Sequence, residues 1–172
     1  MIGRDFVLIG LGGNLTHPCH GGPRATLEAA LDSLAAPDLK VLARSRWYRS
    51  APVPASDQPW FVNGVAALET ALEPAALLAR LHDAEAALGR RRGVRNAART
   101  VDLDLLDYRG RISRPGEQPE LPHPRLTGRA FVLLPLAELA PDWRHPVSGR
   151  SLEALIAELP AEQRTEVMES PT

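Results

Sequence analysis

The sequence predicts an α+β or α/β domain, because stretches with the period of strands alternate along the chain with stretches of helical period. The apolar run from Phe6 to Leu11 and the alternating segment from Val101 to Tyr108 are typical of strands. Between them, the segment from Pro74 to Leu88 repeats apolar side chains every three or four residues, as a helix with one buried face does. A chain of 172 residues fits one domain, so we expect a single domain over residues 1–172.

The N-terminal half is expected to contain three strands, one helix and a long loop. Gly12-Gly13-Asn14 follows the first strand and predicts a turn. Pro37 ends the helix that precedes it. The loop contains three prolines, and loops of this length are often functional. The expected ranges are a strand at 6–11, a helix at 23–34, a strand at 40–48, a loop at 50–59 and a strand at 60–70.

The C-terminal half is expected to be mainly helical. Pro74 suits the first position of the clearest helix, and Gly89 suits its end. Pro135 interrupts a second helical pattern, and Ser151 is the candidate cap of a third. The polar residues from about 160 to 172 predict a fraying tail. The expected ranges are a helix at 74–88, a strand at 101–108, a proline-rich loop at 115–124, and helices at 129–139 and 151–159.

The composition is that of a globular protein in a reducing compartment. Hydrophobic residues make up 44% of the chain and charged residues 24%. Cys19 is the only cysteine, which excludes an intrachain disulfide and a cysteine-based zinc site. The apolar run near the start is too short to span a membrane and lacks a signal-peptide cleavage region. We therefore expect a cytoplasmic protein that does not act at a membrane.

Basic charge is concentrated in one segment. The net charge of −1 argues against general nucleic-acid binding, yet five arginines fall between Arg90 and Arg99. Gly93 and the preceding helix end predict that this segment is a loop. Guanidinium groups match phosphate oxygens, so the segment is a candidate phosphate site. The alternative is a solvated basic loop that pairs with nearby carboxylates.

Asp102 and Asp104 form the strongest local signal. They alternate with Leu103 and Leu105 in a predicted strand, so both carboxylates point to the same face. Two adjacent carboxylates repel unless a positive charge lies between them, and Mg²⁺ commonly bridges carboxylates and substrate phosphates. Arginines beside such a pair describe a polyphosphate site. The alternative is a solvated edge strand of alternating polarity.

Three further positions are candidates with structural alternatives. His82 and Glu85 share a helix face, where a local surface pair is the default interpretation. His123 lies in a rigid Pro-His-Pro loop, where it either donates to phosphate or caps the next turn. Phe61 and Asn63 share a strand face that suits a flat heterocycle with a polar edge. Alternatively, Phe61 belongs to the core and Asn63 holds a turn.

The sequence has neither the GxxxxGK[ST] nor the GxGxxG phosphate-binding motif. From about residue 5 to 158, however, it resembles the 6-hydroxymethyl-7,8-dihydropterin pyrophosphokinase family. The arginine and Asp-Leu-Asp segment is specific to that family when it is combined with the Pro-His-Pro segment. The matching stretches are Ile9–Leu15, Tyr48–Pro52, Asp57–Asn63, Glu85, Leu88–Arg90, Arg99–Leu106, Pro122–Leu126 and Arg129–Val132.

The resemblance implies a ferredoxin-like α+β core, with a mainly antiparallel sheet flanked by helices in α/β/α layers. It implies a diphosphokinase that uses ATP and two Mg²⁺ ions. Such an enzyme transfers the β,γ-pyrophosphoryl group to the pterin hydroxymethyl oxygen and releases AMP, a step of folate biosynthesis. The implied substrates are small molecules, and we expect a monomer that binds no nucleic acid.

The resemblance also implies roles for individual residues. Asp102 and Asp104 would hold the metals and act in catalysis. Arg90 and Arg92 would act in catalysis from a mobile loop that closes over the phosphates. The residues implied for ATP binding are His82, Glu85, Arg92, Arg99, His123 and Arg129. Those implied for pterin binding are Phe61 and Phe131 as a sandwich, Asn63 at the pterin edge, and Ser50, Ala51 and Val53 as pocket backbone.

Three positions depart from the family pattern. The family often has Arg-Trp-Gly-Pro-Arg where this chain has Arg95-Asn96-Ala97-Ala98-Arg99, so the loop tryptophan is missing. His82 replaces a common glutamine, and Gly13 replaces a frequent serine. Two rival functions are an RNA-binding module, which would need exposed aromatic rings and a basic face, and another Mg²⁺-dependent phosphoryl enzyme such as a nuclease or phosphatase.

Overall fold

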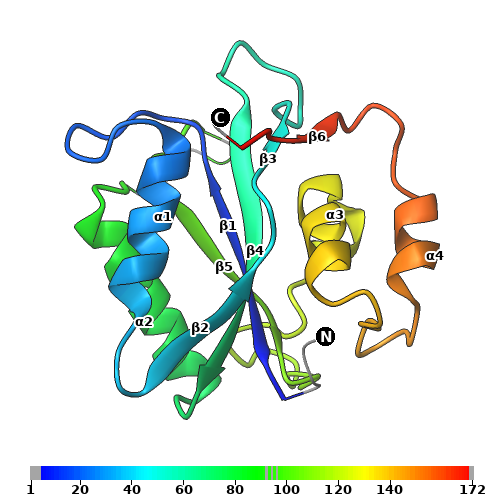
Figure 1. Ribbon diagram of the computed structural model, residues 1–172. Coiled ribbons are helices and arrows are strands. Elements are labelled where there is room, and N and C mark those ends of the chain that lie inside the picture. The colour runs from blue at the N-terminus through cyan, green and yellow to red at the C-terminus, as the bar shows by residue number, and fades with distance from the viewer. Residues whose placement is uncertain (1–4, 92, 94, 96, 171–172) are drawn as a thin grey trace.

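The computed structural model describes residues 5–91, 93, 95 and 97–170. It confirms an α+β fold, in which an antiparallel sheet lies between α1 and α2 on one face and α3 and α4 on the other (Figure 1). The elements of this described part are β1 (Val7–Gly13), α1 (Pro23–Leu34), β2 (Leu39–Arg44), β3 (Tyr48–Ser50), β4 (Phe61–Thr70), α2 (Pro74–Ala87), β5 (Asp102–Tyr108), the 3₁₀ turn η1 (Leu126–Gly128), α3 (Ala130–Leu139), α4 (Leu152–Ala157) and β6 (Thr165–Val167).

Strand β4 is the centre of the sheet. In the described residues the strand order is β5-β1-β4-β3-β6, and β2 also pairs with β4, beside β3 on the same edge. Along β4 nearly every side chain is buried, because helices cover both faces of the sheet. This explains why the sequence of β4 is continuously apolar over Val65 to Leu68 rather than alternating.

Each sheet face has its own hydrophobic core. Val7, Ile9 and Leu11 of β1 pack in the core under α1 and α2, whereas Leu8 packs in the core under α3 and α4. Gly10 and Gly12 lie on the same face of β1 as Leu8, but they have no side chain to fill it. Their cross-strand partners are Val65 and Asp104 for Gly10, and Asn63 and Asp102 for Gly12. The face under α3 therefore changes along the strands from packed core to an open, polar floor.

The predicted turn at Gly12-Gly13-Asn14 is wrong, because β1 extends through both glycines. A Cβ atom on Gly13 would lie 2.5 Å from the carbonyl oxygen of Thr100, closer than any real Cβ contact. Glycine is required at position 13 because Arg99 and Thr100, which follow the arginine segment, pass close to β1 at this point. The backbone N–H of Asn14 donates to the Arg99 carbonyl at 2.9 Å.

Three other expectations need correction. The predicted strand at 40–48 is two strands, β2 and β3, separated by residues 45–47. Pro135 lies inside α3 without ending it. The predicted fraying tail contains β6, which pairs with β3 as an edge strand. The helix at Pro23–Leu34 has the predicted bounds, and Ser151 caps α4, with its Oγ accepting the Ala154 N–H at 3.2 Å.

Candidate active site

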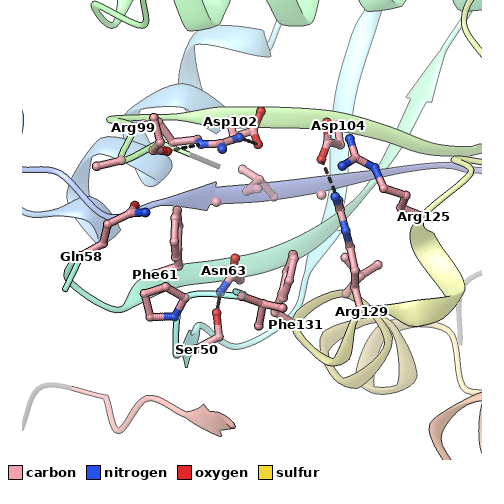
Figure 2. Close-up of a pocket in the computed structure, with 18 of the residues that line it drawn as sticks. Ser50, Gln58, Phe61, Asn63, Arg99, Asp102, Asp104, Arg125, Arg129 and Phe131 are labelled. Carbon is pink, nitrogen blue, oxygen red and sulfur yellow. Dashed lines mark hydrogen bonds and ion pairs between the residues drawn. The ribbon is translucent and has the colours of Figure 1, made fainter. Parts of the chain in front are cut away.

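A cavity of about 890 Å³ opens on the sheet face under α3. The glycines of β1 form its floor, between the Phe61–Asn63 end of β4 and the carboxylates of β5 (Figure 2). The loop after β3, the arginine segment, the chain from Pro124 to Val132, and Gln163 complete its walls. The cavity is large enough for a nucleotide-sized ligand and a small heterocycle together.

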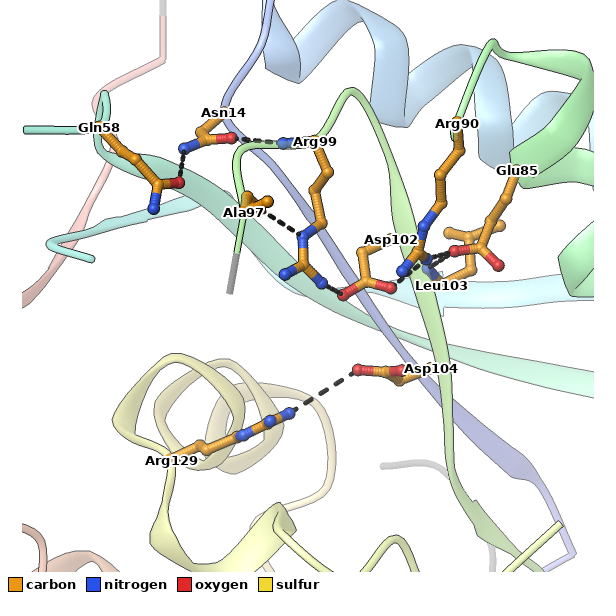
Figure 3. Close-up of polar contacts among 10 residues, drawn as sticks. All are labelled: Asn14, Gln58, Glu85, Arg90, Ala97, Arg99, Asp102, Leu103, Asp104 and Arg129. Atoms are coloured by element: carbon orange, nitrogen blue, oxygen red, sulfur yellow. Dashed lines mark hydrogen bonds and ion pairs between the residues drawn. The ribbon is translucent and has the colours of Figure 1, made fainter. Parts of the chain in front are cut away.

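One side of the cavity is a cluster of arginines around Asp102. Arg90 and Arg99 approach this carboxylate from opposite sides, and the Arg99 Nη1–Asp102 Oδ2 distance is 2.6 Å (Figure 3). Burial would raise the pKa of Asp102, but Arg90 and then Arg99 outweigh it and hold the pKa below its usual value. Asp102 therefore stays ionised, with both of its oxygens occupied by guanidinium groups.

Glu85 supports the Arg90 side of this cluster from behind. Its carboxylate is 3% exposed, forms an ion pair with Arg90, and accepts the backbone N–H of Leu103 at 3.2 Å. This interaction ties the end of α2 to β5. Glu85 does not line the cavity. Glu85 fixes the direction of the Arg90 side chain and so supports a residue that lines the cavity.

Asp104 lies one pleat further along β5 and has far less counter-charge. Burial and the neighbouring Asp102 raise the pKa of Asp104 to about 6, and the Arg129 Nη1–Asp104 Oδ2 distance is 3.8 Å. Within the described residues, no group of three His, Cys, Asp or Glu side chains could hold a metal ion by itself. Two carboxylates on the same face of a strand fit Mg²⁺ whose remaining ligands come from substrate phosphates and water, while the arginines around them fit the phosphates.

The other side of the cavity is aromatic and uncharged. The rings of Phe61 and Phe131 line it, with the Asn63 side chain between them (Figure 2). Asn63 is 4% exposed, and its Nδ2–H donates to Ser50 Oγ at 2.7 Å. Because Gly12 has no side chain, Asn63 Oδ1 can lie against it, where a Cβ atom would be 3.1 Å away. The amide is thus held in one orientation before any ligand binds.

Asn14 connects the two sides and was missed by the sequence prediction. Its Nδ2–H group donates to the Pro59 carbonyl at 3.0 Å and to Gln58 Oε1 at 3.2 Å, while its Oδ1 accepts the Arg99 N–H at 2.9 Å (Figure 3). The loop beside Phe61 and the arginine beside Asp102 are therefore held by one amide. The only sequence signal was an asparagine directly after two glycines.

Most of the predicted site residues meet in this cavity. Those that line it are Ser50, Ala51, Val53, Phe61, Asn63, Arg90, Arg99, Asp102, Asp104, Arg129 and Phe131. Arg92 lies outside the described residues. His82, Glu85 and His123 are not among the lining residues, so a contact of theirs with nucleotide stays a prediction. Gln58, Arg125 and Gln163 also line the cavity and were not predicted to do so.

His123 precedes Arg125 by two residues in the chain, and Arg125 lines the cavity. Its pKa is lowered to about 4 by burial and by the positive charges of Arg129 and Arg125. Its Nδ1 accepts the Arg125 backbone N–H at 3.2 Å, so the neutral ring carries its proton on Nε2. A neutral imidazole with a free donor nitrogen can bind an anionic oxygen without adding charge.

Comparison with known proteins shows the family to which the chain belongs. The model of the 7,8-dihydro-6-hydroxymethylpterin-pyrophosphokinase family matches residues 8–141. The chain belongs to this family. The family match contains β1 to β5 and α3, and therefore all the cavity walls except the one formed by Gln163. None of the described helices is long and apolar enough to cross a membrane.

Curated relatives of this pyrophosphokinase cover most of the chain. A 2-amino-4-hydroxy-6-hydroxymethyldihydropteridine pyrophosphokinase of Pseudomonas aeruginosa is 45% identical over 163 residues, which are 91% of this chain and 93% of the relative. The protein of the same name from Methylorubrum extorquens is 42% identical, over 88% and 91% of the two chains. The folic acid synthesis protein fol1 of Pneumocystis carinii is 37% identical over 88% of this chain but only 20% of its own length.

Proposed function

We propose that this pyrophosphokinase transfers the β,γ-pyrophosphoryl group of ATP to the hydroxymethyl oxygen of 6-hydroxymethyl-7,8-dihydropterin, a step of folate biosynthesis. The hydroxymethyl oxygen forms a bond to the β-phosphorus, the bond from that phosphorus to the α-phosphate oxygen breaks, and the hydroxyl proton is released. The products are the pterin diphosphate and AMP. The observation that carries this proposal is a single cavity whose walls are cationic and acidic on one side and aromatic on the other.

The polyphosphate chain occupies the charged side in this proposal. Arg99 and Arg129 bind its oxygens, and Asp102 and Asp104 hold two Mg²⁺ ions. When bound there, Mg²⁺ neutralises phosphate charge and so makes the phosphorus accessible to an anionic or hydroxyl nucleophile. His123 contributes its Nε2–H to a phosphate oxygen. His82 and Glu85 belong to the nucleotide side, with Glu85 acting through Arg90.

An exchange of partners accompanies binding of the triphosphate. Arg90 and Arg99 pair with the two oxygens of Asp102. The same guanidinium groups are the natural partners of phosphate oxygens, and Asp102 is the natural partner of a divalent cation. With ATP bound, the Arg99 guanidinium would therefore exchange Asp102 for phosphate oxygens, and the freed Asp102 oxygen would be able to hold Mg²⁺. We propose that Arg90, together with Arg92, completes its phosphate contacts only in the reacting state.

The pterin occupies the aromatic side. Its flat ring fits between Phe61 and Phe131, and Asn63 binds its polar edge. Ser50 holds the Asn63 amide, while Ala51 and Val53 contribute backbone at the pocket rim. In this arrangement the hydroxymethyl arm points across the glycine floor toward the charged side. We further propose that the enzyme acts as a monomer, in the cytoplasm and without nucleic acid.

The test is to mix the protein with ATP and Mg²⁺, with and without 6-hydroxymethyl-7,8-dihydropterin, and to separate the nucleotides. We expect AMP to form only when the pterin is present. Release of ADP or inorganic phosphate without pterin would instead indicate a phosphatase or nuclease. Protein that consumes no ATP but binds RNA at moderate salt would support an RNA-binding module.

A further inference from the structure

Residues 163–168, here called the closing segment, lie beyond the family match at 8–141 and yet reach the cavity. The segment contains β6, which pairs with β3, and its last residue, Met168, donates its N–H to the Trp47 carbonyl at 2.8 Å. The Arg164 carbonyl accepts the N–H of the pocket residue Ala51 at 3.0 Å. The closing segment is therefore fastened to the strand and loop that form the pterin wall.

Gln163 fastens the same segment to the start of α3. Its Nε2–H donates to the Gly128 carbonyl at 2.8 Å, and its Oε1 accepts the Ala130 N–H at 2.8 Å. These two backbone groups lie on either side of Arg129. The first turn of a helix leaves backbone N–H groups without partners, and the N-cap residue Arg129 provides no side-chain cap. The Gln163 amide supplies that cap from a distant part of the chain.

The start of α3 carries one residue for each side of the cavity. Arg129 points toward Asp104, at 3.8 Å, and Phe131 forms half of the aromatic wall. The Arg129 guanidinium lies 5.5 Å from the centre of the Phe131 ring, and one short stretch of backbone sets the position of both side chains. A shift of this backbone would misplace a phosphate ligand and a pterin-stacking ring at once, and errors of about 1 Å are costly in catalysis.

We infer that Gln163 is a positioning residue of the transfer reaction, which sets Arg129 and Phe131 through the backbone of Gly128 and Ala130. This inference rests on the proposed function. Gln163 also lines the cavity, so the amide that caps α3 forms the part of the wall between the loop after β3 and α3. A glutamine that only braced the fold would change stability and leave the activity of the folded enzyme unaltered.

The test compares Gln163→Ala and Gln163→Glu with Glu166→Gln. Glu166 lies in the same segment and pairs with Arg49 and Arg164, away from the cavity lining. We expect Gln163→Ala to lower kcat/KM for the pterin about tenfold, the effect of losing one to two net hydrogen bonds, with a higher KM for the pterin. Gln163→Glu keeps an acceptor for the Ala130 N–H and should recover part of the loss. Glu166→Gln should stay within about twofold of the unaltered protein.

A second measurement makes no use of activity. Without ligands, amide hydrogen exchange at the start of α3 should be faster in Gln163→Ala than in Glu166→Gln, because the Ala130 N–H loses its acceptor. A kcat/KM of Gln163→Ala within about twofold of the unaltered protein would overturn the inference, even if exchange at the start of α3 becomes faster, because Gln163 would then only brace the fold. If Gln163→Ala does not fold, the same comparison is made with Gln163→Leu, which also removes the acceptor of the Ala130 N–H but keeps the side-chain volume. If the unaltered protein forms no pterin-dependent AMP, the proposed function fails, and hydrogen exchange still decides whether Gln163 caps α3.

Discussion

The two sides of the cavity are held together in different ways. On the charged side, Asp102 is held by salt bridges to Arg90 and Arg99, and both arginines must change partners if a triphosphate binds. On the aromatic side, Asn63 is held by a hydrogen bond to Ser50 that need not break when a ligand arrives. Interactions made only in the transition state raise the rate, whereas preformed contacts raise affinity. We therefore expect substitutions on the charged side to change the rate of transfer or the affinity for ATP, and substitutions on the aromatic side to change pterin affinity.

The largest expected effect is that of removing a carboxylate. Asp102→Ala or Asp104→Ala should lower kcat at least about a thousandfold, because bound metal supplies several kcal/mol and each ~1.4 kcal/mol is tenfold. AMP formation at saturating Mg²⁺ measures this, and circular dichroism checks the fold. The exposed Asp83 on α2 gives a matched control, since Asp83→Ala should retain full activity. Wild-type turnover by either cavity variant would show that the pair does not hold metal.

A second prediction separates the two arginines that share Asp102. Arg90→Ala should lower the single-turnover rate about a hundredfold with little loss of ATP affinity, because Arg90 pairs with Glu85 and Asp102 and is proposed to reach phosphate only in the reacting state. Arg99→Ala should weaken ATP binding itself. Arg90→Lys should restore only part of the rate, since lysine lacks the planar fork. If Arg90→Ala loses ATP affinity at an unchanged chemical rate, Arg90 is a static phosphate clamp.

The sequence could predict those parts of the fold that depend on local periodicity, but not those that depend on contacts between distant residues. The amphipathic helix at Pro23–Leu34 and the carboxylate strand β5 follow from local periodicity, and both were found with nearly the right bounds. The run through Gly12 and Gly13 was taken for a turn, because the reason for those glycines is the Thr100 carbonyl, which is distant in sequence. The β6 strand was missed because it is a short polar edge strand that depends on β3 for its pairing.

The prediction of the site residues from the sequence was limited in the same way. The two-residue spacing of Asp102 and Asp104 left a metal site and a solvated edge strand as alternatives, the neighbouring arginines and the family resemblance favoured the site, and the structure brings both carboxylates to the cavity. Asn14 and Gln163 could not be found in this way. Their roles come from hydrogen bonds to backbone groups of Pro59, Arg99 and Ala130, and no local pattern marks a side chain that serves a remote segment. Residues that touch substrate leave a chemical signature in the sequence, and residues that hold them leave almost none.

A third prediction concerns the aromatic side. Phe61→Ala and Phe131→Ala should each weaken pterin binding about tenfold or more, because a ring contact contributes about 1 kcal/mol beyond the area it buries. ATP affinity should change by less than about twofold. Calorimetric titration of both ligands measures the split, and Phe61→Leu, which keeps apolar volume without a ring, should lose less. Equal losses for ATP and pterin would mean that these rings serve the core rather than a sandwich.

The smallest expected effect tests whether the charged side also contains a group that stays neutral. Burial, Arg129 and Arg125 lower the pKa of His123 to about 4, and only the more distant Asp102 opposes them. Because an unfolded histidine titrates near 6.5, the unfolded chain binds an extra proton between about pH 6.5 and 4, and stability falls as pH falls through that window. His123→Asn should flatten that slope by at most ~1.4 kcal/mol per pH unit in denaturant titrations. In NMR spectra of the folded protein, the His123 imidazole should show no midpoint between pH 5.5 and 8. A midpoint near 6.5 would contradict the lowered pKa, and a midpoint above 7 would mean that the ring is charged at neutral pH and binds phosphate as a cation like its arginine neighbours.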